Sequence, residues 1–147
     1  MENQLKLAKP WVQALLSQPL LARLATVNPV TLQPHVVPVW FSWDGESIWI
    51  SAFSSTRKLK EVVKNPRIAV IIDTGEENPP MRAVLMEGKA EILTDPQTVQ
   101  KWSLTIYTHY MGEDGVKAPE PQSWIVDPEN TIIKLTPEKV YIWGQSD

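Results

Sequence analysis

The residues with the clearest chemical potential lie in one short segment, residues 51–58 (SAFSSTRK). A strand-like stretch runs into hydroxyl residues at 54–56, which can cap a helix, and the cations Arg57 and Lys58 follow. Cations in a first helical turn are unfavourable beside the positive end of the helix dipole, and an anionic ligand would remove that cost. From these residues alone two interpretations stay open: an anion-binding helix start, or a capped helix with two solvated cations.

Tryptophan is the second signal, with seven in 147 residues. Trp40, Trp43 and Trp49 flank the turn signal at Asp44-Gly45, where they could wall a planar ligand, line a subunit interface or fill a barrel. Pro38 interrupts the best strand pattern, and proline cannot donate to a sheet. This stretch is therefore an edge strand, a bulge, or a place where the backbone faces a ligand.

Several kinds of chemistry are excluded. The absence of cysteine rules out disulfides, thiol catalysis, iron–sulfur clusters and thiolate zinc sites. The six glycines form no dinucleotide or P-loop motif, and no GxSxG motif is present. His35 and His109, the only histidines, lie in different expected elements, so no metal site is predicted. His35 either contacts a cofactor or is partly exposed at a strand start, and His109 is expected on the solvated side of a helix.

Size and charge indicate one soluble domain spanning residues 1–147. A net charge of −3 without a basic cluster argues against nucleic-acid binding. The N-terminus lacks the features of a signal peptide, and no apolar run approaches the roughly 18 residues of a membrane span. We therefore expect a cytoplasmic protein with no membrane partner.

The elements that must position these residues are mostly strands. Helices are predicted at 10–16, from 57 to the Asn65-Pro66 stop, and after Asp95-Pro96, where Val99, Trp102, Ile106 and Tyr110 share a face. Strands are predicted at 20–27, 35–43, 47–52, 67–73, 82–93, 131–135 and 139–142, and polar loops at 74–80 and 112–122. The first three strands would form an antiparallel meander. About six strands without βαβ alternation favour a mainly β, closed or half-closed antiparallel barrel.

The order of these features resembles a known family. The matching segments are 24–27 (LATV), 34–41 (PHVVPVWF), the Asp44-Gly45 hairpin, 56–58 (TRK), 86–91 (MEGKAE) and 132–143 (IIKLTPEKVYIW). Together, over roughly residues 10–143, they resemble the pyridoxamine 5′-phosphate oxidase-like FMN-binding split β-barrels. The resemblance implies a six-stranded antiparallel split barrel with a few short helices.

The resemblance also implies a cofactor and a partner. FMN would lie in a groove between the two protomers of a homodimer. The isoalloxazine ring would be lined by Val36, Val37, Pro38 and Val39. The ribityl chain would run along Ser51 and Ala52, and the phosphate would be held by Thr56, Arg57 and Lys58. Trp102 and Trp143 are candidates to complete the site from the second subunit.

The implied activity is that of an FMN-dependent oxidoreductase acting on an unidentified small molecule. Oxidases proper of this family bind pyridoxal phosphate through a C-terminal segment with arginine and histidine. The only arginines here are Arg23, Arg57, Arg67 and Arg82, so a different substrate is expected. Alternatives are a non-enzymatic flavin-binding or sensing protein, a tryptophan-rich interaction module without cofactor, and an F420-type deazaflavin reductase. The larger deazaflavin tail would need more cations near the groove than the sequence suggests.

Overall fold

Alternation of apolar and polar residues along the strands turns one sheet face inward, and this pattern builds the fold. The computed structural model describes residues 1–74 and 81–144. Its helices are α1 (Glu2–Leu7), α2 (Pro10–Leu16), α3 (Arg57–Lys64), α4 (Pro96–Gly115) and α5 (Pro119–Ile125). Its strands are β1 (Ala22–Val27), β2 (Pro34–Val39), β3 (Ser42–Trp43), β4 (Ile48–Phe53), β5 (Arg67–Asp73), β6 (Ala83–Leu93), β7 (Asn130–Leu135) and β8 (Lys139–Trp143). The expected polar loop at 74–80 lies almost entirely outside the described residues.

The strands form one antiparallel sheet in the order β2-β1-β5-β6-β7-β4-β3, with β8 added beside β6. Strand β6 pairs with β5 and β8 in its first part and with β7 over Ala90 to Leu93, so it bends between two halves of the sheet. At this bend a Cβ on Gly88 would lie 3.1 Å from Cδ1 of Leu135 and 3.2 Å from the backbone N of Glu138, so the space for a side chain is tight. The curled half-barrel confirms the predicted fold class, with eight strands in the described residues rather than six.

The predicted strand at 35–43 is wrong, because the structure divides it between opposite edges of the sheet. Strand β2 pairs with β1 as far as the Ala22–Val39 pair, and β3 pairs with β4. Between them Phe41 is buried in the core, and its N–H donates to the Tyr110 hydroxyl at 3.1 Å instead of to a strand. The predicted meander is therefore right only in part: β1 pairs with β2, and β3 pairs with β4 across the Asp44-Gly45 turn, but β2 and β4 are not neighbours. Pro38 does lie on an edge strand.

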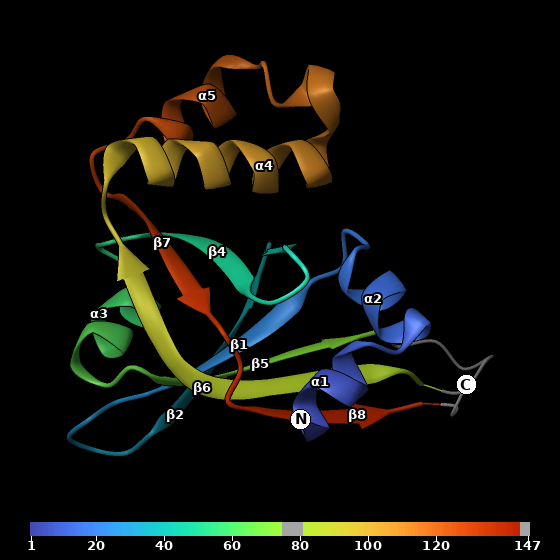
Figure 1. The fold of residues 1–147 in the computed structure, drawn as a ribbon. Coiled ribbons are helices and arrows are strands. Elements are labelled where there is room, and N and C mark those ends of the chain that lie inside the picture. Colours follow the sequence, from blue (N-terminus) through green and yellow to red (C-terminus); the bar gives the residue numbers. More distant parts are fainter. Residues whose placement is uncertain (75–80, 145–147) are drawn as a thin grey trace.

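Two hydrophobic clusters hold the elements together. The larger fills the barrel and includes side chains of α2, β1, β4, β5 and β6. The smaller lies between the outer face of β4 and β7 and the helices α4 and α5, which lie together above those strands (Figure 1). Strand β4 thus separates the two clusters, with Ile50 in the barrel and Trp49 under α4.

Helices occur where none was predicted. The expected loop at 112–122 instead contains the end of α4, broken at Gly112 (φ 80°), and the start of α5. Proline at the first turn of α5 suits a helix start, and Pro121 and Ile125 of that helix are buried. Helix α1 is tied to β8 through Asn3, whose side-chain oxygen accepts from the Val140 N–H at 3.0 Å. Helix α1 thus depends on a contact distant in the sequence.

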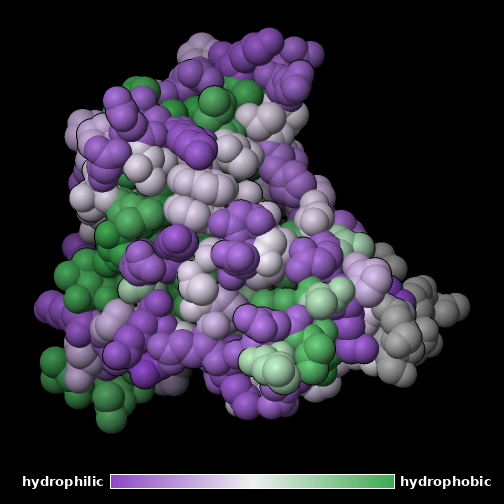
Figure 2. Space-filling model, in the orientation of Figure 1, coloured by the Kyte–Doolittle hydropathy of each residue, from purple (hydrophilic) through white to green (hydrophobic). Residues whose placement is uncertain are grey.

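An apolar feature projects from the surface in the view of Figure 2. At the tip of the β1–β2 loop Val30 and Leu32 are 86% and 68% exposed, and this tip is the green patch at the lower left of Figure 2. Within residues 1–74 and 81–144, no helix has both the length and the apolar character needed to cross a bilayer.

Candidate functional site

A cleft of about 340 Å³ forms where β2, β4, α3 and α4 meet. It is lined by Leu21, Pro38, Val39, Trp40, Ser51, Lys58, Ile106 and Tyr107. Four residues predicted from the sequence as cofactor-binding, Pro38, Val39, Ser51 and Lys58, thus come together from three elements. The volume is at the lower end of the range for ligand pockets, about 300–1,000 Å³.

Lys58 is the charged group of this cleft. Its side chain is half-buried, and it makes no hydrogen bond or ion pair with any residue that the structure describes. Burial lowers the pKa of its ammonium group. A partly desolvated cation without a partner is unfavourable unless an anion binds beside it.

The start of α3 strengthens this anion-binding character. Thr56 occupies the N-cap position as predicted, but its hydroxyl donates to the Phe53 carbonyl at 2.7 Å and does not cap the helix. The predicted capping by this hydroxyl is therefore wrong. The first-turn N–H groups of α3 consequently have no side-chain acceptor from Thr56.

Arg57 has different surroundings from Lys58. Its Nε donates to Oε2 of Glu61 at 3.1 Å, and the Glu61 side chain is only 6% exposed. The Thr26 hydroxyl donates to Oε1 of Glu61 at 2.6 Å, and this bond, helped by Arg57, lowers the pKa of Glu61. Nδ1 of His35 lies 3.4 Å from the same carboxylate, and His35 does not line the cleft.

A second hollow, which Arg57 lines, lies beside α3. It measures about 390 Å³ and gathers three cations of α3, Arg57, Lys60 and Lys64, beside Asn28, Pro29, Ser55 and Glu61. Of the three residues predicted to hold a phosphate, the structure therefore brings only Lys58 to the cleft and places Arg57 in this cationic hollow.

Ser51 belongs to a chain of hydrogen bonds that the sequence did not reveal. Its hydroxyl lies 2.9 Å from the Tyr107 hydroxyl and donates to Oδ1 of Asn130 at 2.8 Å. Nδ2 of Asn130 donates to the Ser103 hydroxyl at 2.8 Å. Burial raises the pKa of Tyr107. The predicted stripe of α4, Trp102 included, packs in or against the smaller cluster, and buried Ser103 and Tyr107 widen that face beyond the prediction.

Aromatic rings form one wall of the cleft. Trp40 stacks on Tyr110 with ring centroids 4.7 Å apart and planes 4° apart. The Tyr110 hydroxyl donates to the Leu20 carbonyl at 2.6 Å, and burial raises its pKa to about 12. Trp43 packs against the barrel core and Trp49 against α4. Of the three tryptophans around the hairpin, Trp40 alone lines this cleft.

The other predicted residues do not line the cleft. Val36 is 60% exposed on the edge strand, whereas Val37 and Ala52 pack into the barrel. Trp102 stacks on Trp49 with centroids 3.8 Å apart, and Trp143 is 44% exposed at the end of β8.

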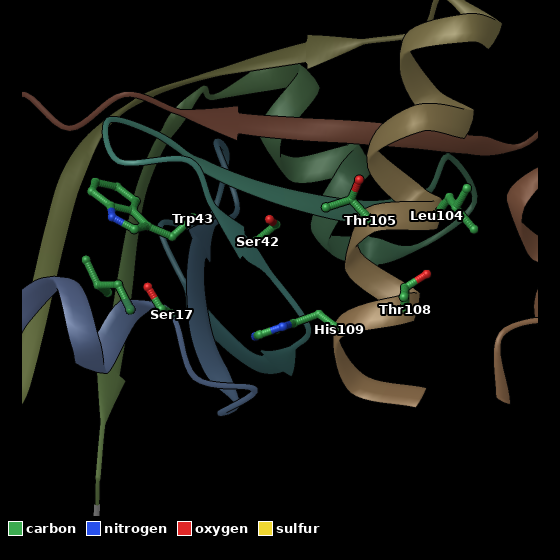
Figure 3. A pocket seen from close by; sticks show the side chains of 8 residues that line it. Ser17, Ser42, Trp43, Leu104, Thr105, Thr108 and His109 are labelled. Carbon is green, nitrogen blue, oxygen red and sulfur yellow. The ribbon is translucent and has the colours of Figure 1, made fainter. Parts of the chain in front are cut away.

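A larger cleft of about 540 Å³ lies between α2, β3 and α4 (Figure 3). Its lining residues are Leu16, Ser17, Ser42, Trp43, Leu104, Thr105, Thr108 and His109. His109 is exposed, as predicted, and the lining contains no carboxylate, lysine or arginine. Among the described residues, no three histidine, aspartate or glutamate side chains gather as metal ligands would. The cleft at Lys58 is the candidate site for an anionic ligand, because its cation has no partner among the described residues, whereas Arg57 of the cationic hollow is paired with Glu61.

Comparison with solved structures supports the fold. A conserved hypothetical protein from Mycobacterium tuberculosis is 20% identical (TM-score 0.77), with 92% of this chain and 84% of that chain covered. An F420 reductase is 28% identical (TM-score 0.71), with coverages of 88% and 94%. A FAD-binding protein from Mesorhizobium loti is 19% identical (TM-score 0.64), with coverages of 87% and 88%.

Comparison of sequences identifies the family. No curated protein matches this sequence. The profile described as pyridoxamine 5′-phosphate oxidase matches residues 8–144, which is nearly the whole chain and includes every residue of the Lys58 cleft. The chain therefore belongs to the pyridoxamine 5′-phosphate oxidase family.

Proposed function

We propose that the protein binds FMN in the Lys58 cleft and acts as an FMN-dependent oxidoreductase on an unidentified small molecule. The observation that carries this proposal is the half-buried Lys58, which has no partner in the described part of the chain and lies in a cleft that Trp40 and Tyr107 also line. Family membership supports it, as do the names of two similar structures, a FAD-binding protein and an F420 reductase.

The residues present fit such a cofactor. Lys58 and the uncapped first turn of α3 would hold the phosphate. Pro38 and Val39 on edge strand β2 would lie against the ring, and Ser51 and Tyr107 would lie beside the polyol chain. A bound flavin would supply the redox chemistry, and the protein would supply position and electrostatics. Trp40 and the apolar lining would exclude water from one side of the ring.

We further propose that a second copy of the chain covers this cleft. Cross-strand pairing places Pro38, Arg23, Ile71, Leu85 and Tyr141 in one row on the outer face of the sheet. Ile71 and Leu85 belong to neither hydrophobic cluster. Because Pro38 belongs to both the row and the cleft, a homodimer formed through this face would close the site. Trp143 is on the same face as Tyr141, two residues along β8.

The cationic hollow supports a second candidate, an F420-type deazaflavin reductase. An acidic cofactor tail needs cations beyond the phosphate site, and Arg57, Lys60 and Lys64 gather next to it on the same helix as Lys58. For that cofactor the double variant Lys60→Ala/Lys64→Ala should weaken binding. FMN binding should be unchanged in the same variant.

The test is flavin retention by the purified protein. After incubation with FMN and removal of free ligand, the protein should keep a flavin absorbance spectrum with about one flavin per chain. Oxidation of NAD(P)H by the loaded protein with an added acceptor would separate an enzyme from a binding or sensing protein. A chain that retains neither FMN nor deazaflavin would refute the proposal and favour an interaction module. Sedimentation of the loaded protein as a stable monomer would refute the dimer.

A further inference from the structure

The hydrogen bonds behind the cleft have only one consistent arrangement of protons. Asn130 is buried, and its Nδ2 donates to the Ser103 hydroxyl at 2.8 Å and to the Ile125 carbonyl at 3.4 Å. The opposite amide orientation would set the side-chain oxygen against the Ile125 carbonyl, with two acceptors facing each other. Oδ1 of Asn130 is therefore the acceptor facing Ser51.

This arrangement determines the direction of the next bond. A serine hydroxyl carries one proton, and Ser51 donates it to Oδ1 of Asn130 at 2.8 Å. The 2.9 Å contact between Ser51 and Tyr107 must then be donated by Tyr107. Since burial raises the pKa of Tyr107, this hydroxyl keeps its proton at neutral pH.

Tyr107 and Ser51 both line the cleft. With its only proton committed to Ser51, the Tyr107 hydroxyl can offer a ligand nothing but a lone pair. Lys58, in contrast, carries only donors. A well-matched ligand thus combines an anion for Lys58 with a hydrogen-bond donor for Tyr107.

We infer that Tyr107 is a specificity-determining residue that accepts a hydrogen bond from a hydroxyl of a phosphorylated polyol. For the identity of that ligand this inference rests on the proposed function, in which the polyol is the ribityl chain of FMN. A ligand with an acceptor-only chain would place an oxygen against the Tyr107 lone pair and should gain no affinity over a chain without oxygens.

The test compares three flavins that share the ring and the terminal phosphate. The first is FMN, the second has an alkyl chain without oxygens, and the third has a chain whose ether oxygen accepts but cannot donate. Wild type should bind FMN about three- to tenfold more tightly than the alkyl flavin, the effect of one neutral hydrogen bond, and the ether flavin no better than the alkyl one. Tyr107→Phe should remove the preference for FMN while leaving the alkyl flavin unchanged.

Ser51→Ala gives the sharper result, because without the Ser51 hydroxyl the Tyr107 O–H can donate its hydrogen bond to the ligand. In this variant the ether flavin should bind better than the alkyl flavin, a reversal that loss of packing alone would not produce. Tyr110→Phe is the matched control. The Tyr110 hydroxyl donates to the Leu20 carbonyl and accepts from the Phe41 N–H, so the variant should lose stability but keep the wild-type order of affinities. Melting curves would show which variants are folded.

The outcomes separate the two proposals. If wild type retains no FMN, both the proposed function and this inference fail. If FMN binds but Tyr107→Phe keeps the full preference for the polyol chain, the inference alone is overturned. Equal binding of FMN and the ether flavin by wild type would also overturn it.

Discussion

Two neighbouring cations at the start of α3 have opposite surroundings. Arg57 is 54% exposed, yet it is paired with the buried Glu61. Lys58 is half-buried, yet it has no partner among the described residues and its pKa is lowered. A position one residue along the helix turns the side chain by about 100°, from the cationic hollow to the cleft. The sequence suggests that the two cations form one anion site. In the structure Arg57 belongs to an ion pair, and Lys58 has no partner among the described residues.

The largest expected effect comes from removing the free charge. Lys58→Ala should weaken FMN binding by about ten- to a hundredfold, because a hydrogen bond to a charged group is worth roughly 1.5–3 kcal/mol. Riboflavin, which lacks the phosphate, should bind the variant and wild type alike. Fluorescence titration measures both.

Arg57→Ala is the matched control for that variant. It should change the FMN affinity by less than about threefold, as expected for an exposed cation engaged elsewhere. If the two alanine variants lose FMN affinity equally, the contrast between Arg57 and Lys58 is wrong.

A second effect follows from the lowered pKa of Lys58. Binding of a phosphate favours the charged ammonium, so it raises this pKa again. FMN affinity should therefore fall several-fold at alkaline pH, once the free protein loses the Lys58 proton. Riboflavin affinity should stay flat over the same range. Parallel titrations of both flavins across pH would show this, and equal slopes would contradict it.

The ionisation of Glu61, which is paired with Arg57 on α3, should determine how stability changes in acid. The Thr26 hydroxyl and Arg57 hold the pKa of Glu61 below its ordinary 4.5, so ionised Glu61 stabilises the fold above about that pH. This stabilisation should be lost as pH falls through the lowered pKa. Thermal melting from neutral pH to about pH 3 should show a steeper loss for wild type than for Glu61→Gln. Parallel curves would mean that Glu61 titrates alike in the folded and unfolded chains.

The smallest effect is expected at Thr56. A capping threonine typically costs about 1 kcal/mol when replaced by alanine. Here the hydroxyl bonds the Phe53 carbonyl and does not cap α3, so Thr56→Ala should change stability by only about 0.5 kcal/mol. Chemical denaturation would measure the difference, and a loss above about 1 kcal/mol would restore a capping role.

Much of the fold could be predicted from local features of the sequence. Residues 54–56 and Asn65-Pro66 predicted the limits of α3. Pro38 predicted an edge strand, a bulge or backbone facing a ligand, and the structure shows the edge strand. The failed prediction at residues 35–43 depends on a distant partner. The strand pairing ends at Phe41, whose N–H donates to the hydroxyl of Tyr110, 69 positions further along the chain. No feature of residues 35–43 themselves indicates this bond.

Some residues of the candidate site could likewise be predicted from the sequence, and others could not. The family resemblance pointed to residues 38, 39, 51 and 58, and the cations that follow a helix start pointed independently to Lys58. Tyr107 was missed because its role depends on Ser51 and Asn130, which belong to other elements. The pairing of Arg57 was visible as an i, i+4 spacing with Glu61, a pattern that commonly forms ion pairs.

The central claim is that Lys58 and the start of α3 hold the phosphate of a flavin. The most direct measurement compares the affinity of the wild-type protein for FMN and for riboflavin, which share the ring and the ribityl chain. FMN should bind at least about tenfold more tightly, as one charge-assisted hydrogen bond requires. Equal affinities for the two flavins would contradict the claim and leave Lys58 as a partly buried cation without a ligand.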